Sequence, residues 1–488
     1  MTRPSRRRGR SSHRGGGAPL LAIVGIAAVP ALVLAGTWGF ASANVPPTTT
    51  TTTTTLPPAP VEEMTTDVLS FRRHPTPIAG RLAEEAVAEQ TAAVAGDLVE
   101  LVDDGSCLRV TADGVDLAAE SEDLAVIPAS NQKLVVAAVA LDVLGADHRF
   151  RTEVRSVPPV EGVVDGDLHL IGGGDPLLRT AAVVDQSRYP EFNTTDLAAL
   201  ADQLVELGVE RVTGDVVGDE SRYDDERRVP TWGDDITKLD AGPIGALVVN
   251  DGRLPTGDFA IAPASASART LVELLAERGI VVAGSARQGT TPDGLAPLVL
   301  VESEPLPNIL VALLHTSDNH TAEMLVKEIG VAGAGQGTRA AGIEVMRATL
   351  ARWGVPLDGV VLDDGSGLSR DNRLTCAALA DLVATVPVAD DLVGLLPVAG
   401  RDGTLSTQLV GTRAEAELRA KTGTLTDVKA LTGSVPDGAG DDVEFALVLN
   451  GTDVDDEAVY TPVWERLVEV IGELPVVVVP DVAAVAPR

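Results

Sequence analysis

The most informative stretch of this chain is SNQKLVVAAVALDVL, at residues 130–144. Its apolar residues recur with helical spacing, which predicts a long helix over 131–144. The predicted buried face consists of Leu134, Ala137, Ala138 and Leu141. Because the loop Ile127-Pro128-Ala129 leads directly into this segment, Ser130 lies at the start of the predicted helix.

A serine at a helix start is most often a cap, but Ser130 is followed three residues later by Lys133. Residues three apart lie on one helical face, so the lysine can reach the hydroxyl. A lysine that burial keeps neutral can take the proton of a serine nucleophile. The backbone N–H groups of a helix start favour a developing oxyanion. This pattern therefore predicts acyl transfer, although the short motif needs support from other motifs.

Two further motifs follow in the chain. Ser317-Asp318-Asn319 lies between predicted helices at 308–314 and 322–329. Lys421-Thr422-Gly423-Thr424 contains the only Lys-Thr-Gly of the sequence, in a chain with only five lysines. We expect Gly423 to let a substrate backbone approach the strand that carries it.

Alternating and apolar runs predict the strands near these motifs. Segments 417–425, 428–435 and 443–449 are typical of consecutive antiparallel strands. A helix is expected over 82–94, followed by a strand pair over 96–115 that turns at Asp103-Asp104-Gly105.

The composition excludes several classes of function. There are 38 Lys+Arg against 71 Asp+Glu, a net charge of −33, so no nucleic-acid partner is expected. At 45% hydrophobic and 22% charged residues, most of the chain is globular. The six histidines show no metal-ligand spacing, so neither a metal site nor a cofactor is predicted. The two cysteines, Cys107 and Cys376, leave a single disulfide open.

The amino-terminal region predicts export. Residues 1–17 contain six arginines and no acid. The segment 18–43 contains no charged residue and is long enough to span a bilayer. The positive-inside rule then places the tail in the cytoplasm and the body outside. A retained membrane anchor is favoured over a signal peptide cleaved near Ala41-Ser42-Ala43. The Thr- and Pro-rich segment that follows, over 44–66, is typical of an extended spacer.

The ordered trio Ser130-x-x-Lys133, Ser317-x-Asn319 and Lys421-Thr422-Gly423 resembles the penicillin-interacting serine enzymes. The whole pattern is similar to the D-alanyl-D-alanine carboxypeptidase/endopeptidase family of class C penicillin-binding proteins. Four further stretches carry this narrower resemblance: Gly172-Gly173-Gly174-Asp175-Pro176, Leu247-Val248-Val249-Asn250, Ala322-Glu323 and Asp364-Gly365-Ser366-Gly367-Leu368-Ser369-Arg370. We interpret the glycines of the last stretch as forming tight turns.

The resemblance implies a role for each motif residue. Ser130 is the expected nucleophile and Lys133 its general base. Ser317 is expected to relay a proton to the departing amine, tuned by Lys133 and Lys421. The expected substrate-binding residues are Asn319, Lys421, Thr422, Gly423 and Thr424, and the expected oxyanion hole consists of the backbone N–H groups of Ser130 and Thr424. The implied partners are peptidoglycan stem peptides, β-lactam antibiotics as inhibitors, and a membrane through the amino-terminal segment.

The resemblance also implies an α+β fold. We expect a serine β-lactamase/transpeptidase-like catalytic domain, an antiparallel sheet flanked by helices, with an inserted, mainly β domain. The predicted segments are a basic cytoplasmic tail (1–17), a transmembrane anchor or signal segment (18–43), a linker (44–66), the first part of the catalytic domain (67–150), the inserted domain (151–300), the second part of the catalytic domain (301–475) and a carboxy-terminal tail (476–488). Within the insertion, the charged run 219–228 is interpreted as a solvated loop, in preference to a loop that lines the substrate path.

Two alternatives to the peptidase stay open at this point. The first is a β-lactamase on the same scaffold, although no Glu-x-x-x-Asn follows Ser317-Asp318-Asn319 to supply a base for deacylation. The second is a cell-wall-binding scaffold protein without catalysis. The intact lysines and serines of the three motifs argue against the second alternative.

Overall fold

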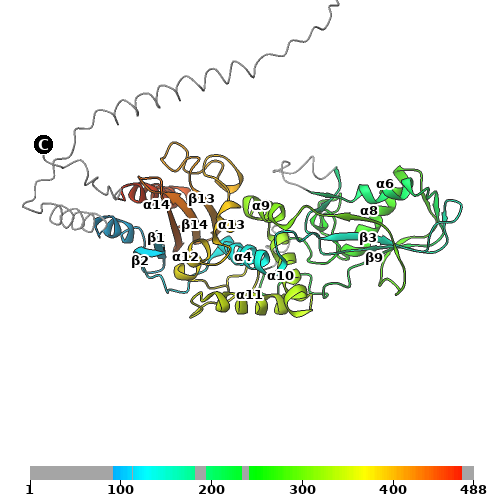
Figure 1. Ribbon diagram of the computed structural model, residues 1–488, viewed down its shortest axis with the longest axis horizontal. Coiled ribbons are helices and arrows are strands. Elements are labelled where there is room, and N and C mark those ends of the chain that lie inside the picture. The colour runs from blue at the N-terminus through cyan, green and yellow to red at the C-terminus, as the bar shows by residue number, and fades with distance from the viewer. Residues whose placement is uncertain (1–91, 113, 182–193, 234–240, 475–488) are drawn as a thin grey trace, which may run out of the picture. The chain divides into compact units, whose positions relative to one another are not determined.

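The computed structural model describes residues 92–112, 114–181, 194–233 and 241–474 (Figure 1). Its central feature is a five-stranded antiparallel sheet with the strand order β13-β14-β15-β1-β2. The strands are β1 (Cys107–Ala112), β2 (Val115–Glu120), β13 (Arg419–Leu425), β14 (Val428–Pro436) and β15 (Asp442–Asn450). The three strands predicted around the Lys-Thr-Gly motif are thus confirmed.

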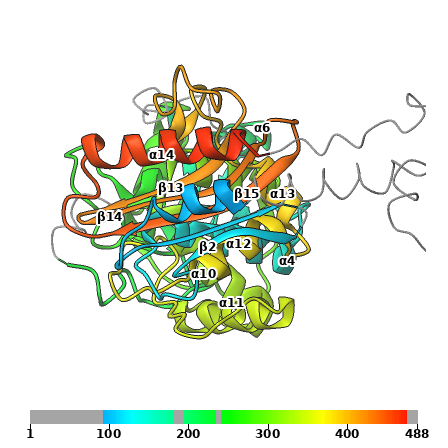
Figure 2. The ribbon, with the colours of Figure 1, turned by 90° about the vertical axis from the view of Figure 1, so that its left-hand side faces the viewer.

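Helices cover both faces of this sheet, because β14 and β15 carry apolar side chains on both sides. Leu431 and Leu447 point into a core with α14 (Glu457–Gly472) and the helical residues 92–99. Their neighbours Ala430 and Ala446 point into a second core on the opposite face. Figure 2 shows α14 along one face and α4, α10 and α12 toward the other.

The second core is organised around the helix that follows Ser130. A 3₁₀ turn, η1 (Ala129–Asn131), leads into α4 (Gln132–Leu144), whose residues from Gln132 to Leu141 are all buried. The predicted helix is confirmed, although it is enclosed on all sides and not on one face alone. Its neighbours are α9 (Leu306–Thr316), α10 (Asn319–Ala334), α11 (Arg339–Trp353), α12 (Cys376–Ala384) and α13 (Ala389–Gly394).

The predicted strand pair over 96–115 is wrong in its position. Residues 92–99 are helical, and the Asp103 carboxylate accepts hydrogen bonds from Gly105 N and Ser106 Oγ in the turn before β1. The hairpin forms further along, between β1 and β2, where Gly114 has a φ of 73°. Asp-Gly occurs at both 104–105 and 113–114, and each pair favours a turn, but only the second turn joins two paired strands.

The inserted segment forms a second five-stranded sheet, ordered β11-β9-β5-β3-β12. Strands β5, β9 and β11 are parallel, so a crossover has to join each strand to the next. Helix α6 lies in the crossover from β5 to β9, and α8 lies in the crossover from β9 to β11. The structure thus refines the expected mainly β insertion to a mixed sheet with two helices (Figure 1). The elements are β3 (Arg151–Arg155), β5 (Leu168–Ile171), α6 (Ala198–Glu206), β9 (Val216–Asp219), α8 (Pro263–Glu277), β11 (Ala286–Gln288) and β12 (Pro297–Glu302).

Shorter elements complete the described residues. Three two-residue strands form a small parallel sheet: β4 (Val163–Val164), β8 (Arg211–Val212) and β10 (Val281–Val282). The others are β6 (Leu178–Arg179), β7 (Thr195–Asp196), η2 (Asn250–Gly252) and η3 (Gly403–Leu405).

The charged run 219–228 connects the insertion to helix α10, contrary to the interpretation as a solvated loop. Lys327 Nζ lies 2.5 Å from Asp224 Oδ1, and Arg222 binds Glu328 through both of its carboxylate oxygens. Within the run, Arg227 pairs with Glu220. The sequence could not show this, because the partners of the run lie about one hundred residues away.

The two cysteines, whose pairing the sequence left open, form a disulfide. Cys107 in β1 and Cys376 at the start of α12 have Cα atoms 5.8 Å apart. The bond ties the sheet to the helical core beneath it.

Other predicted segments fall outside the described residues. These are the basic tail 1–17, the apolar segment 18–43, the linker 44–66, the carboxy-terminal tail 476–488 and most of the helix 82–94. Among the residues that the structure describes, no helix has the length and apolar character needed to cross a membrane. The segment boundaries given above stay predictions.

Candidate active site

Ser130 lies in the 3₁₀ turn η1, two residues before the start of α4 at Gln132. It does not cap the helix, because the capping position is taken by Asn131 without a side-chain bond. Ala129 has a φ of 47°. Its carbonyl packs so closely on Gly367 that any side chain at position 367 would collide with the carbonyl oxygen. The turn is thus held in a conformation that leaves the Ser130 side chain partly exposed.

Lys133 is fully buried, and its Nζ has three oxygen partners. They are Ser130 Oγ at 3.0 Å, Asn319 Oδ1 at 2.7 Å and the backbone oxygen of Ser366 at 2.5 Å. Burial lowers the pKa of Lys133 to about 8, although the charges of Asp364, Asp318 and Glu323 oppose the shift.

These partners suit a neutral amine that acts as a base. The Asn319 and Ser366 oxygens can only accept, so they take two N–H groups of the lysine. The lone pair of the neutral amine then faces Ser130 Oγ, whose hydroxyl can donate to it. The geometry therefore provides for removal of the serine proton.

The second and third motifs meet at Ser317. This residue ends α9 with a φ of 59°, and Lys421 Nζ donates to its Oγ over 3.1 Å. Lys421 also donates to the backbone oxygen of Thr422. Burial, followed by the charge of Lys133, holds the pKa of Lys421 well below its usual value. The structure thus brings together Ser130, Lys133, Ser317, Asn319 and Lys421 in one connected site.

The remaining predicted residues lie along β13. Thr422 Oγ1 donates to Thr404 Oγ1 over 2.8 Å, and Thr424 Oγ1 accepts from Lys429 Nζ over 3.0 Å. β13 is an edge strand whose outer side pairs, in the described residues, only near its start with 397–399. Its free edge can therefore accept an extended peptide.

Gly423 lies close to another part of the chain. A Cβ at this position would lie 2.8 Å from the Pro128 carbonyl oxygen and 3.2 Å from Ala129 Cβ. The glycine therefore allows β13 to pass close to the turn that carries Ser130. The expected approach of a substrate backbone at Gly423 stays a prediction.

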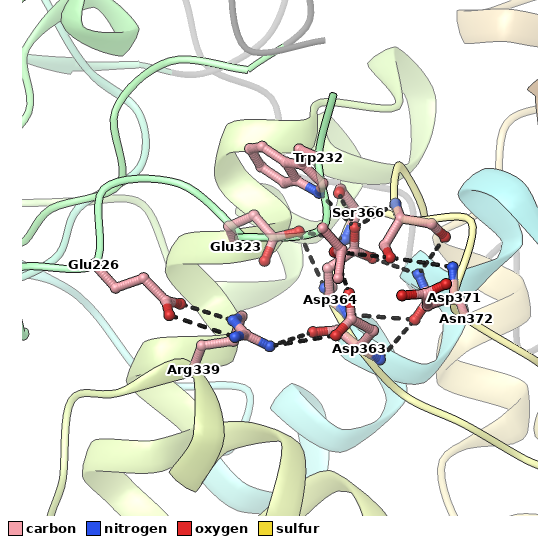
Figure 3. Close-up of polar contacts among 12 residues, drawn as sticks. Glu226, Trp232, Glu323, Arg339, Asp363, Asp364, Ser366, Asp371 and Asn372 are labelled. Atoms are coloured by element: carbon pink, nitrogen blue, oxygen red, sulfur yellow. Dashed lines mark hydrogen bonds and ion pairs between the residues drawn. The ribbon is translucent and has the colours of Figure 1, made fainter. Parts of the chain in front are cut away.

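The loop 364–372 is the part of the site that the sequence did not assign. Its glycines were interpreted only as tight turns, yet Ser366 places its carbonyl oxygen on Lys133. Asp364 folds the loop by accepting from Gly367 N, Ser369 N and Asn372 Nδ2 (Figure 3). A backbone carbonyl has no side-chain signature, so only the glycines flanking Ser366 hinted at this role.

No group of three His, Cys, Asp or Glu side chains that could hold a metal ion occurs in the described ranges.

Sequence comparison identifies the family. The profile described as the D-Ala-D-Ala carboxypeptidase 3 (S13) family matches residues 87–257 and 255–463. The chain belongs to this carboxypeptidase family. The match spans every residue of the site described above.

Curated relatives of the carboxypeptidase family agree with this assignment. A D-alanyl-D-alanine carboxypeptidase from an Actinomadura species is 34% identical over 426 residues, covering 70% of this chain and 76% of the relative. Carboxypeptidase DacB from Mycolicibacterium smegmatis is 32% identical over 466 residues, covering 92% of this chain and 95% of the relative.

A solved structure supports the same fold. Penicillin-binding protein 4 (dacB) from Haemophilus influenzae superimposes with a TM-score of 0.64 at 22% identity, covering 78% of this chain and 97% of that one. The chain therefore shares the α+β fold of that solved protein.

Proposed function

We propose that this protein is a serine-type D-Ala-D-Ala carboxypeptidase that trims peptidoglycan stem peptides through an acyl-enzyme on Ser130. One observation carries the proposal. Lys133 Nζ lies 3.0 Å from Ser130 Oγ, while two other oxygens occupy its remaining N–H groups. A buried lysine held in this way can act as a base toward the serine.

Acylation follows from this arrangement. Ser130 Oγ attacks the carbonyl carbon of the peptide bond between the two D-alanines, and its proton passes to Lys133. The tetrahedral oxyanion is stabilised by the backbone N–H groups of Ser130 and Thr424. When the C–N bond breaks, Ser317 gives its hydroxyl proton to the departing amine, while Lys421 donates a hydrogen bond to its Oγ. Ser317 then recovers a proton from Lys133, so the proton taken from Ser130 leaves with the released D-alanine and Lys133 is neutral again for the attack by water. Water then hydrolyses the ester and regenerates the serine.

Substrate binding is assigned to the free edge of β13 and to Asn319. Lys421 and Thr422 lie where the terminal carboxylate of the stem, or the acid group of a β-lactam, can be held. Asn319 orients the substrate amide. The names of the relatives support the substrate class, and a structure of the Haemophilus protein is described as a complex with a β-lactam.

We also propose an extracytoplasmic location. The arginine-rich start and the uncharged segment 18–43 support a cytoplasmic tail followed by a membrane anchor, or by a cleaved signal. Peptidoglycan lies outside the membrane, so this location places the catalytic residues beside the proposed substrate.

The test uses the full chain and a Ser130→Ala variant. Intact mass after incubation with benzylpenicillin should show one stable adduct on the wild type and none on the variant. Release of D-alanine from a pentapeptide stem should depend on the same serine. Rapid consumption of penicillin would instead indicate a β-lactamase, and neither adduct nor release from folded wild type would indicate a binding protein without catalysis.

A further inference from the structure

Glu323 is a buried acid near Lys133, and no function has been given to Glu323 so far. It lies on α10, four residues after Asn319 and therefore on the same helical face. Its side chain is 1% exposed. Asn319 contacts Lys133 directly, whereas the hydrogen bonds of Glu323 go to the loop behind the lysine.

The contacts of Glu323 hold two successive backbone N–H groups of that loop. Its Oε1 accepts hydrogen bonds from Gly365 N at 3.0 Å and from Ser366 N at 2.7 Å (Figure 3). Ser366 in turn presents its carbonyl oxygen to Lys133 Nζ at 2.5 Å. One carboxyl oxygen thus holds the residue whose carbonyl orients the lysine.

Asp364 binds different backbone N–H groups of the loop, those of Gly367 and Ser369, and it also accepts from Ser366 Oγ over 3.2 Å. The contribution of Glu323 is therefore the part that acts through Gly365 N and Ser366 N. Besides its bonds within the loop, the Asp364 carboxylate accepts from the indole N–H of Trp232 in the insertion, over 2.8 Å. Figure 3 shows Trp232 and Glu323 reaching the loop from different elements. Asp364 makes no hydrogen bond to Gly365 N or Ser366 N, and these two groups depend on Glu323.

Glu323 can fulfil this task without a charge. Burial, followed by the negative charge of Asp364, raises the pKa of Glu323 to about 8, so the carboxyl is mainly protonated at pH 7. Its second oxygen, Oε2, has no hydrogen-bond partner among the described residues. The oxygen that matters is Oε1, and a neutral amide can supply an oxygen at the same place.

We propose that Glu323 is a positioning residue for the reaction: it holds the Ser366 carbonyl against Lys133 and so directs the lysine lone pair toward Ser130. This inference rests on the proposed function, since it concerns the base of that reaction. This role requires a side chain long enough to place an acceptor oxygen at the two loop N–H groups, and it does not require a negative charge.

Two substitutions separate reach from charge. Glu323→Gln keeps the length and the acceptor oxygen but cannot ionise, whereas Glu323→Asp keeps the carboxyl but is one methylene shorter. At pH 7 the glutamine variant should form the benzylpenicillin adduct within about threefold of the wild-type rate. The aspartate variant should be slower by about thirtyfold or more, because a displacement of about 1 Å near the reacting groups is costly.

The matched control is Glu328→Asp, the same shortening of a buried glutamate on the same helix. Glu328 binds Arg222 and Tyr223 and not the loop, so its shortening should leave the adduct rate within about threefold. Thermal unfolding of each variant shows the fraction folded, and rates are compared per folded protein.

The outcomes distinguish this inference from the proposed function. If the wild type forms no Ser130 adduct, the proposed function itself fails. If the wild type reacts and the glutamine variant is as slow as the aspartate variant, or slower, a role for charge replaces the positioning role. Equal, near wild-type rates in both variants would also overturn the inference.

Discussion

Two regions of this protein bury lysines, and they do so in opposite ways. In the active site, Lys133 and Lys421 are fully buried and bind hydroxyl, amide and carbonyl oxygens. Where the insertion meets α10, Lys327 is 1% exposed and pairs with the carboxylate of Asp224 at 2.5 Å. Within the described residues, neither active-site lysine forms an ion pair with a carboxylate.

The difference shows what makes a buried lysine reactive. Burial lowers the pKa of all three amines, but at Lys327 the hydrogen bond and charge of Asp224 oppose the shift most directly. A lysine with neutral partners can lose its proton without leaving a buried carboxylate unpaired. The region around Lys133 is thus suited to proton transfer, and the region around Lys327 to holding two parts of the chain together.

The sharpest test of this comparison is Lys133→Met. Removing the general base should slow adduct formation with benzylpenicillin by about 10³-fold, because Ser130 loses its proton acceptor. The rate is measured by intact mass over time, and circular dichroism verifies that the variant is folded. A rate within tenfold of the wild type would mean that another group is the base.

The corresponding change in the other region, Lys327→Met, should act on stability. It leaves the Asp224 carboxylate without its partner and should lower the free energy of unfolding by about 2 kcal/mol. The loss is smaller than for a fully enclosed pair because the Asp224 side chain is 37% exposed. Urea unfolding at pH 7 measures it, and the adduct rate of the folded variant should change by less than about threefold. A large loss of rate with full stability would contradict the comparison.

The pH dependence of acylation provides a third test. The pKa of Lys133 is about 8 in the folded protein, so the neutral base becomes more abundant as the pH rises. Between pH 7 and pH 9 the neutral fraction, and with it the adduct rate, should increase about tenfold. Lys327→Met should show the same profile. A rate that stays constant over this range would exclude deprotonation of Lys133 as the controlling step.

The smallest effect is expected from a third type of buried lysine. Lys429 Nζ lies 3.7 Å from the centre of the Tyr460 ring and donates to Thr424 Oγ1, and burial lowers its pKa to about 8. Lys429→Met should nevertheless slow adduct formation by less than about threefold, because Thr424 is assigned a role through its backbone N–H. A hundredfold slowing in the same assay would show that the Lys429 amine contributes to the reaction through its contact with Thr424.

The parts of the site that the sequence predicted are those with side-chain signatures. Ser130 lies in the turn that leads into the helix of Lys133, three residues before the lysine, and Lys421 lies in a strand with clear alternation. The sequence pattern predicted both the helix and the strand. The structure then shows that Ser317 and Asn319 lie within hydrogen-bond distance of the two lysines. The roles given to these residues stay predictions until the variants are measured.

The parts that could not be predicted depend on contacts between distant segments. Nothing in the sequence shows that the Ser366 carbonyl would face Lys133, or that Glu323 would bind the loop amides. The pairing of Cys107 with Cys376 was equally open, since no spacing rule joins residues 269 positions apart. The two-residue strands of the insertion are too short to give a periodic pattern.

The pairing of β1 with β15 sets an order of events during synthesis. Cys107 lies opposite Val448, so the central sheet cannot close until almost the whole chain has left the ribosome. All strands of the insertion, by contrast, precede residue 303, and the unit can fold while the later half is still being made. Oxidation of Cys107 with Cys376 can likewise come before residues 419–450 arrive. The nascent protein can therefore acquire a folded module and a covalent clamp before it acquires a reactive serine in a finished site.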